Sequence, residues 1–265
     1  MRQIDLNTWD ELEKEVHKLH EFLKSKRHPE CYGTISKPLF RGQRSASWNL
    51  STTLERYINH NISVTQYNHY LWRIKPAIEA YTGNNWNIET EINFDDKFIP
   101  IPSNSEFMAY VRHHGFPSPL LDWSESLYIA SFFAFQKASI KENVAIYAYV
   151  EKLGDGKCVE VGAPQIWGLD PYVSTHKRHF MQQGQYTVSV EKSYEEWVYC
   201  SHEKYFSAAT DESQDYLIKY TLPGDIKIQI LEKLQSMNIN SFTLFGNEDS
   251  LMDMLAFKEI FKKTI

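Results

Sequence analysis

Two stretches of the sequence carry side chains that could do chemistry. The first is Arg41-Gly42-Gln43, which follows a short strand-like run. A planar guanidinium beside a glycine offers a two-pronged donor next to a backbone that a ligand can approach closely. This pattern is typical of phosphate or pyrophosphate recognition. A strand-end arginine in a surface salt bridge would give the same pattern, so both interpretations stay open.

The second stretch, residues 107–135, reads FMAYVRHHGFPSPLLDWSESLYIASFFAF. His113 and His114 precede a turn with two prolines, and Asp122 and Trp123 precede an apolar helix. Polar groups among apolar neighbours must be hydrogen-bonded or functional, because burying them without a partner is costly. Asp122 could be a functional carboxylate, or it could simply cap the helix that follows it.

A third polar group lies further along the chain. Gln182 and Gln183 lead directly into a strand-like run from Tyr186 to Val190. We therefore expect both glutamines at the end of a sheet, where binding groups tend to gather. Gln182 could equally do no more than satisfy the backbone at the start of that strand.

Hydrophobic periodicity predicts an α+β fold, in which helices flank a mixed or antiparallel sheet. We expect one domain over 1–265, with a helical extension over 1–36 and a core over 37–265, and strands clustered in the second half. A loop or insertion is expected over 83–104. The expected helices cover 8–26, 64–81, 105–112, 124 or 126 to 138, 223–237 and 248–262, and the expected strands cover 38–40, 144–150, 186–190 and 216–222.

Composition narrows the class of protein. Of the 265 residues, 42% are hydrophobic and 23% are charged, which is ordinary for a globular protein and argues against disorder. The formal net charge of -6 gives no overall basic field for nucleic acid, although a local groove could still be positive. The aromatic share of 14% is high, and it serves either packing or stacking on flat ligands such as nucleobases.

Cysteine usage and hydropathy indicate where the protein resides. The sequence has three cysteines, Cys31, Cys158 and Cys200. Their odd number fits a reducing cytoplasm, and they lie too far apart for the spacing of a metal site. No apolar run is long enough to span a bilayer, and the N-terminus lacks the basic-then-apolar order of a signal peptide. We therefore expect a soluble cytoplasmic protein without a membrane partner or a metal.

Four motifs, taken in order, resemble the FRG-domain family, which is named for its Phe-Arg-Gly motif. The resemblance spans about residues 37–251. The motifs are Phe40-Arg41-Gly42-Gln43 with Trp48, Leu50 and Arg56; His113-His114-Gly115-Phe116-Pro117-Ser118 with Leu120-Leu121-Asp122-Trp123-Ser124 and the expected helix Ala130-Ser131-Phe132-Phe133-Ala134; Arg178 with Gln182, Gly184 and Tyr186; and Ile239-Asn240 with Thr243-Leu244-Phe245.

The chain also departs from the family pattern. Many members carry Arg where this chain has Pro119, Gln where it has Arg112, and Pro where it has Leu127. Arg112 could replace the arginine that is missing at position 119.

The resemblance implies a function and its partners. FRG domains are similar to the ADP-ribosyltransferase fold, and relatives occur in bacterial anti-phage toxin–antitoxin systems. It therefore implies a toxin that uses NAD as a substrate and transfers ADP-ribose to a macromolecule, with RNA or single-stranded DNA as the expected acceptor. An antitoxin or a chaperone is the implied protein partner.

The same resemblance implies roles in binding NAD. Cleavage of the nicotinamide–ribose bond requires a clamp for the pyrophosphate and aromatic walls for the nicotinamide. Arg41 would hold the pyrophosphate or the ribose, with Gly42 and Gln43 beside it on the same strand. The stacking surface would be supplied by Tyr110, Trp123 or Tyr186.

Catalysis would then need a group on the ribose and a base for the acceptor. Gln182 would hold the ribose hydroxyl, but an amide cannot take a proton. Asp122 is therefore the expected base, and His113 is the second candidate or the group that orients the acceptor.

Two functions of other classes remain open. A metal-independent nuclease could use His113, His114, Asp122, Arg41 and Arg112 for general acid–base cleavage, and it would shorten RNA without NAD. A non-catalytic module would bind a nucleotide or a protein without turnover, and it would tolerate Asp122→Asn.

Overall fold

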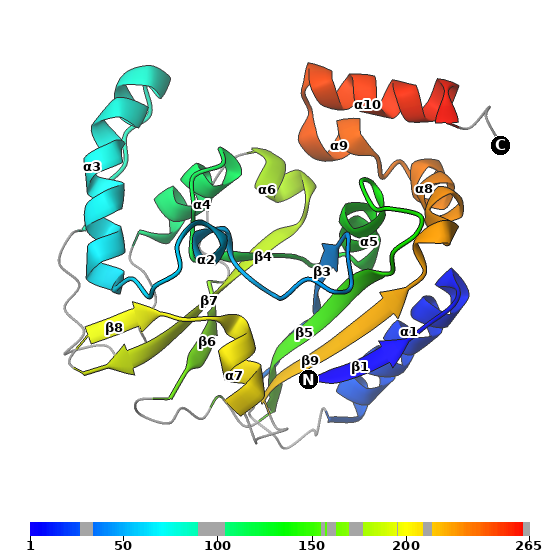
Figure 1. Ribbon diagram of the computed structural model, residues 1–265, viewed down its shortest axis with the longest axis horizontal. Helices are drawn as coiled ribbons and strands as arrows, with labels where there is room; N and C mark the ends of the chain where they lie inside the picture. The colour runs from blue at the N-terminus through cyan, green and yellow to red at the C-terminus, as the bar shows by residue number, and fades with distance from the viewer. Residues whose placement is uncertain are drawn as a thin grey trace.

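The computed structural model describes residues 1–26, 34–89, 104–154, 157, 163–169, 177–194, 196–208 and 214–261. Cys31, Cys158 and most of the loop expected over 83–104 lie outside these residues. Figure 1 shows a sheet that runs through the molecule with helices packed around it. The predicted α+β class is confirmed.

The described strands form one nine-stranded sheet in the order β1-β9-β5-β3-β4-β7-β6, and β2 and β8 add to β5 and β7. β1 runs parallel to β9, and every other pairing is antiparallel. The strands are β1 (Arg2–Asp5), β2 (Thr34–Ile35), β3 (Leu39–Gln43), β4 (Leu121–Ser124), β5 (Val144–Gly154), β6 (Gln165–Gly168), β7 (Gly184–Ser193), β8 (Glu196–Tyr199) and β9 (Gln214–Leu222).

The predicted clustering of strands in the second half of the chain is wrong. β1, β2, β3 and β4 all lie in the first half. Three of these four have only two to four residues, which is too short for an alternating pattern to stand out in the sequence.

The long helices begin and end within a few residues of the predicted positions. Among the described residues the helices are α1 (Trp9–Lys26), α2 (Thr53–Tyr57), α3 (Val64–Thr82), α4 (Ser105–His113), α5 (Leu127–Phe135), α6 (Lys177–Met181), α7 (His202–Ala208), the 3-10 turn η1 (Gly224–Ile226), α8 (Lys227–Ser236), α9 (Ser241–Phe245) and α10 (Glu248–Glu259).

Three apolar clusters hold the sheet and the helices together. The first packs α1, α5 and α8 against one face of β5 and β9. The second packs α3 and α4 against β7, and the third lies between β4, β5 and α7. Alternate residues of β5 enter the first and third clusters, so this central strand is buried on both faces.

The N-terminal segment shares this core. β1 pairs with β9, and α1 places a stripe of buried residues, among them Leu12 and Val16, in the first cluster. Figure 1 shows both elements lying along β9. Among the described residues, no helix has the length and apolar character needed to cross a membrane.

Candidate functional site

The sheet opens between its two middle strands. β3 and β4 are neighbours, but they pair at a single position, where Phe40 lies opposite Ser124. Beyond it, β3 continues to pair with β5 and β4 with β7, so the ladder between β3 and β4 stops. Arg41 spans this opening, because its Nη1 donates to the carbonyl of Asp122 at 2.8 Å.

A cavity of about 1020 Å³ lies at this opening, and we call it the cleft. It is walled by β3 and the loop that follows it, the end of α4, β4, α5, α6, the start of β7 and the end of α9. The lining residues are Phe40, Arg41, Gly42, Gln43, Arg44, Ser47, Trp48, Asn49, Ser51, Arg56, Arg112, His113, Asp122, Trp123, Ser124, Ala130, Phe133, Gln136, Lys137, Arg178, Gln182, Gly184, Tyr186 and Phe245.

The charge of the cleft is opposite to that of the whole chain. Among the described residues that line it, Asp122 is the only carboxylate, whereas the chain as a whole has a net charge of -6. The cleft therefore favours an anionic ligand. The six cationic side chains are the half-buried Arg41, Arg112 and Arg178 and the exposed Arg44, Arg56 and Lys137.

Crowding of these cations is visible in their pKa values. The pKa of Arg41 is lowered to about 10, mainly by burial; Asp122 opposes this decrease, and the neighbouring Arg112 and Arg56 add to it. Burial and Arg112 also lower the pKa of Arg56. Arg41 is still a cation at neutral pH, so an anion bound in the cleft would relieve the mutual repulsion.

Asp122 lies in β4 and does not cap the following helix. Ser126 caps α5 instead, because its Oγ accepts from the backbone N–H of Ile129 at 3.3 Å. The carboxylate of Asp122 forms an ion pair with Arg112 through Oδ2, and its side chain is 38% exposed. The helix-cap interpretation of Asp122 is therefore wrong.

Several buried polar atoms around the cleft have no hydrogen-bond partner. Four of the ten such atoms in the described residues belong to cleft residues. An unpartnered buried group costs about 1–3 kcal/mol, so native proteins retain such groups where a function needs them. The four atoms are Arg41 Nε, Gln43 Oε1, Arg112 Nε and Asp122 Oδ1.

Residues 36–143 match the family model of the FRG domain. We identify this segment, 108 of the 265 residues, as an FRG domain. The match covers β3, α4, β4 and α5, and it contains Asp122 and every cleft cation except Arg178. No curated protein and no solved structure shows significant similarity to the chain.

The glycine of the FRG motif is required by packing. A Cβ at Gly42 would lie 1.9 Å from the carbonyl oxygen of Ala130 and 2.6 Å from the backbone nitrogen of Ala134. α5 therefore crosses β3 so closely that only glycine fits at this position. Close approach of a ligand, which the sequence predicted for Gly42, is not needed to explain the residue, although Gly42 does line the cleft.

The two glutamines that were predicted as site residues, Gln43 and Gln182, also hold the walls of the cleft. Gln43 Nε2 donates to the carbonyl of Asn49 at 3.1 Å. Gln182 Nε2 donates to the carbonyl of Leu244 at 3.0 Å, and Arg178 Nε donates to that of Phe245 at 3.3 Å. α6 thus fixes the end of α9, which brings Phe245 into the cleft from a distant part of the sequence.

The predicted stacking residues are the main correction in the site. Trp123 and Tyr186 line the cleft but are only 4% and 2% exposed. Trp123 stacks on Tyr149 at 5.3 Å, and its Nε1 donates to Thr187 Oγ1 at 2.8 Å. Neither ring offers a free face, because both are committed to the core.

Tyr110 lies away from the cleft. Its ring packs on Trp86 and His114, with centroid distances of 4.7 and 4.6 Å, in the second apolar cluster. We therefore assign Tyr110 to the packing of α4. The accessible aromatic surface of the cleft belongs instead to Trp48, Phe133 and Phe245.

His113 meets a second histidine across Tyr186. His113 Nε2 and His179 Nδ1 lie 2.7 and 3.2 Å from the Tyr186 hydroxyl. Burial lowers the pKa of His179 and raises the pKa of Tyr186 above its ordinary value. This His–Tyr–His chain joins α4, β7 and α6 beside Asp122. Sequence reasoning did not single out His179.

The described residues hold no cluster of three or more His, Cys, Asp or Glu side chains that could bind a metal ion. The arrangement that they do form, a cationic cleft around one carboxylate, can bind an anion and hold a base beside it.

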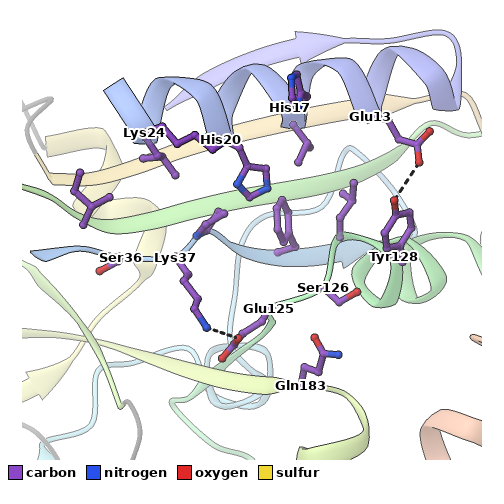
Figure 2. Close-up of a pocket in the computed structure, with 16 residues that line it drawn as sticks. Glu13, His17, His20, Lys24, Ser36, Lys37, Glu125, Ser126, Tyr128 and Gln183 are labelled. Carbon is purple, nitrogen blue, oxygen red and sulfur yellow. Dashed lines mark hydrogen bonds and ion pairs between the residues drawn. The ribbon is translucent and has the colours of Figure 1, made fainter. Parts of the chain in front are cut away.

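A second cavity, of about 600 Å³, lies between α1 and the start of α5, and we call it the α1 groove. Figure 2 shows its lining. Its charges have both signs and are paired: Glu13 accepts from Tyr128 Oη at 3.3 Å and Lys233 Nζ at 3.1 Å, and Glu125 lies 3.4 Å from Lys37 Nζ. The α1 groove therefore has no charge preference comparable to that of the cleft.

Proposed function

We propose that the cleft of this FRG domain binds NAD and transfers its ADP-ribose to a macromolecule, with nucleic acid as the acceptor. The observation that carries the proposal is the set of six cations around the single carboxylate Asp122 in an otherwise acidic chain. A dinucleotide matches this arrangement, because it presents a pyrophosphate to arginines and flat rings to aromatic side chains.

In this proposal the half-buried arginines bind the pyrophosphate. Arg41, Arg112 and Arg178 reach the cleft from β3, α4 and α6. Arg41 uses Nη1 to hold β4, and its buried Nε has no partner. A bound phosphate oxygen near this guanidinium would offset part of the cost of its burial.

The flat rings of NAD have one aromatic wall available. Phe133 and Phe245 meet edge to face with ring centroids 5.9 Å apart, and both line the cleft. Gln182 lies beside them and uses its Nε2 to hold Leu244, which leaves its Oε1 to accept from a ribose hydroxyl.

Asp122 is the proposed base. In the reaction, an oxygen or nitrogen of the acceptor bonds to C1′ of the nicotinamide ribose while the C1′–N bond breaks. Nicotinamide leaves with the bonding pair, and the acceptor proton passes to the carboxylate of Asp122. The ion pair with Arg112 fixes the orientation of this carboxylate, which also stabilises the positive charge that develops on the ribose.

The proposal is tested by incubating the protein with adenine-labelled NAD and, in parallel, RNA, single-stranded DNA or cell protein. We expect one of these three acceptors to become labelled. The labelling should be lost in Arg41→Ala and Asp122→Ala, but it should be kept in Lys37→Ala, which changes the α1 groove. Circular dichroism confirms that the variants fold. Shortened RNA without label would establish a nuclease instead, and bound NAD without turnover would establish a binding module.

We further propose that this activity serves bacterial defence against phage, as a toxin restrained by an antitoxin or chaperone. Exposed apolar side chains at the C-terminal end of the described chain offer a surface for such a partner: Met237, Phe242, Met252, Leu255 and Ile260. Expression in bacteria should arrest growth for the wild type and not for Asp122→Ala. Equal growth with both chains would contradict the toxin role.

A further inference from the structure

The loop between β3 and α2 places a large aromatic side chain at the mouth of the cleft. Trp48 lines the cleft and is 47% exposed. The guanidinium of Arg44 lies over its ring, 5.0 Å from the centroid. A tryptophan that stays half exposed forgoes part of the stabilisation that burial of its apolar surface would give. Other aromatic side chains of the described residues are as exposed, but Trp48 combines its exposure with a place in a cationic cleft, where a flat ring can stack on a ligand.

The exposure of Trp48 is not the result of a loose loop. Ala46 is held on both sides, because its N–H donates to the carbonyl of Asn143 at 2.7 Å and its carbonyl accepts from Lys219 Nζ at 2.7 Å. Further along, the N–H of Leu50 donates to Glu203 Oε1 at 2.6 Å. The loop is thus anchored to β5, β9 and α7, and it presents the indole without a further cost of ordering on binding.

The cations nearest to solvent also exceed what a dinucleotide needs. A pyrophosphate carries two negative charges, whereas the six cations of the cleft face one carboxylate. Arg44 and Lys137 form no ion pair with any carboxylate in the described part of the chain. Arg56 uses Nη1 to hold the carbonyl of Ser51 at 2.7 Å and is otherwise exposed. The outer half of the cleft therefore keeps a positive charge.

We propose that Trp48 with Arg44, Arg56 and Lys137 forms a binding site for single-stranded nucleic acid, in which a base stacks on the indole and the three cations pair with phosphates. This inference rests on the proposed function in one respect: the bound strand is taken to be the acceptor of ADP-ribose. Binding of the strand requires no NAD.

The geometry favours an unpaired strand over a duplex. Bases within a duplex are already stacked on their neighbours, so a protruding indole can take a base only from a strand that is not paired. A base has a π-face whatever its identity, so one tryptophan gives affinity with little sequence preference. The Arg44 guanidinium on the same ring adds a cation that is positioned for the adjoining phosphate.

The experiment is fluorescence anisotropy with labelled oligonucleotides of about twelve nucleotides, in the length range that one single-strand site covers. Single-stranded RNA, single-stranded DNA and duplex DNA form three arms, all without NAD. We expect both single strands to bind more tightly than the duplex. Trp48→Ala should weaken single-strand binding by roughly five- to 150-fold, the fold-change equivalent to about 1–3 kcal/mol of stacking, and Trp48→Phe should retain most of it.

Two controls are matched to these variants. Trp72 and Arg73 are exposed on α3 and lie outside the cleft. Trp72→Ala and Arg73→Ala should therefore bind oligonucleotide as the wild type does. Salt dependence gives a second readout, because each phosphate contact contributes about 0.7 to the slope of log K against log salt for a single strand. Arg44→Ala and Lys137→Ala should each lower the slope by about that amount.

Three results would overturn the inference: equal binding of duplex and single strands, wild-type affinity in Trp48→Ala, or displacement of the oligonucleotide by saturating NAD, which would assign Trp48 to the adenine of NAD. Nicotinamide release from NAD is measured separately on the wild-type protein. Oligonucleotide binding without nicotinamide release would support this site and contradict the proposed transferase. Nicotinamide release without oligonucleotide binding would support the proposed transferase and contradict this site.

Discussion

The cleft and the α1 groove both border Phe40 on β3, but their charges are organised differently. Among the described residues of the cleft, cations from β3, α2, α4, α6 and the connecting segments share one carboxylate, and four polar atoms are buried without partners. In the α1 groove, Glu13 and Glu125 each have a cationic partner. None of the unpartnered buried atoms of the described residues belongs to a residue that lines the groove.

This difference shows that a cavity alone is a weak sign of function. The α1 groove is the space left where an outer helix covers the sheet, and its charged groups are satisfied by one another. The cleft keeps an electrostatic imbalance that a protein folded only for stability would have lost. Uncompensated charge, together with buried atoms that lack partners, is therefore the reason why we place the proposed function in the cleft.

The largest expected effect is a loss of stability on substitution of Gly42 in β3, the strand that both cavities border. Gly42→Ala would push a Cβ against the backbone of α5, with a first contact at 1.9 Å, and backbone cannot move aside as a side chain can. We expect a loss of about 3 kcal/mol or more in the free energy of unfolding, at the upper end of overpacking effects. Urea denaturation measures it.

Gly83→Ala is the matched control. Gly83 has a φ of +72° at the end of α3, with no atom within 4 Å of an added Cβ. It should cost only the backbone strain of about 1–2 kcal/mol. If the two variants lose the same stability, packing of α5 on β3 is not the reason for Gly42.

The next largest expected effect is a pH dependence of the free energy of unfolding, and it arises from the buried His202 behind the cleft. His202 Nε2 lies 2.9 Å from Thr187 Oγ1, which also accepts from Trp123 Nε1. Burial, together with the nearby cations Arg41 and Lys157, lowers the pKa of His202 to about 3 from an ordinary value of 6.5. The unfolded chain thus takes up a proton below about pH 6.5 that the native protein refuses until about pH 3.

The sign of the pH effect follows from that difference. Stability falls as the pH drops below 6.5, by about 1.4 kcal/mol per pH unit from His202 alone. In His202→Gln this contribution should be missing, so denaturation between pH 6.5 and 4.5 should show a smaller loss than in the wild type. Parallel stability profiles for the two proteins would contradict the assignment of a buried neutral histidine.

The smallest effect compares one ion pair from each cavity. Arg112 and Asp122 have side chains 17% and 38% exposed, whereas Lys37 and Glu125 are 80% and 36% exposed. A double-mutant cycle replaces Arg112 or Lys37 with Gln, Asp122 with Asn, and Glu125 with Gln. The coupling energy of Arg112 and Asp122 in the cleft should be about 1 kcal/mol or more. The exposed pair should give about 0.5 kcal/mol or less, because solvent screens it. Equal coupling in the two pairs would remove the contrast.

Much of the fold was predictable because its long elements are encoded locally. The helix predicted over 8–26 is Trp9–Lys26, and the one predicted over 105–112 is Ser105–His113. β1 and β4 were missed because each has four residues and forms only by pairing with a distant strand. Such non-local pairings leave no periodic pattern in the sequence.

The site was also predictable in part, where its residues belong to local sequence motifs. Arg41, Asp122, His113 and Gln182 do meet in one cleft, since their motifs lie on or beside strands that become neighbours. The aromatic wall was assigned to the wrong side chains, because burial of Trp123 depends on tertiary packing. Arg56, Arg178 and Phe133 were visible in family motifs, although Phe133 was expected only to pack, whereas nothing in the sequence pointed to Lys137.

The most direct test of the account is calorimetric titration of the wild type, Arg41→Gln and Lys37→Gln with ADP-ribose. Arg41 contributes to the cleft and Lys37 to the α1 groove. We predict saturable binding to the wild type, unchanged binding to Lys37→Gln, and at least tenfold weaker binding to Arg41→Gln, which equals about 1.4 kcal/mol. No saturable binding by the wild type, or equal weakening in both variants, would contradict a nucleotide site in the cleft.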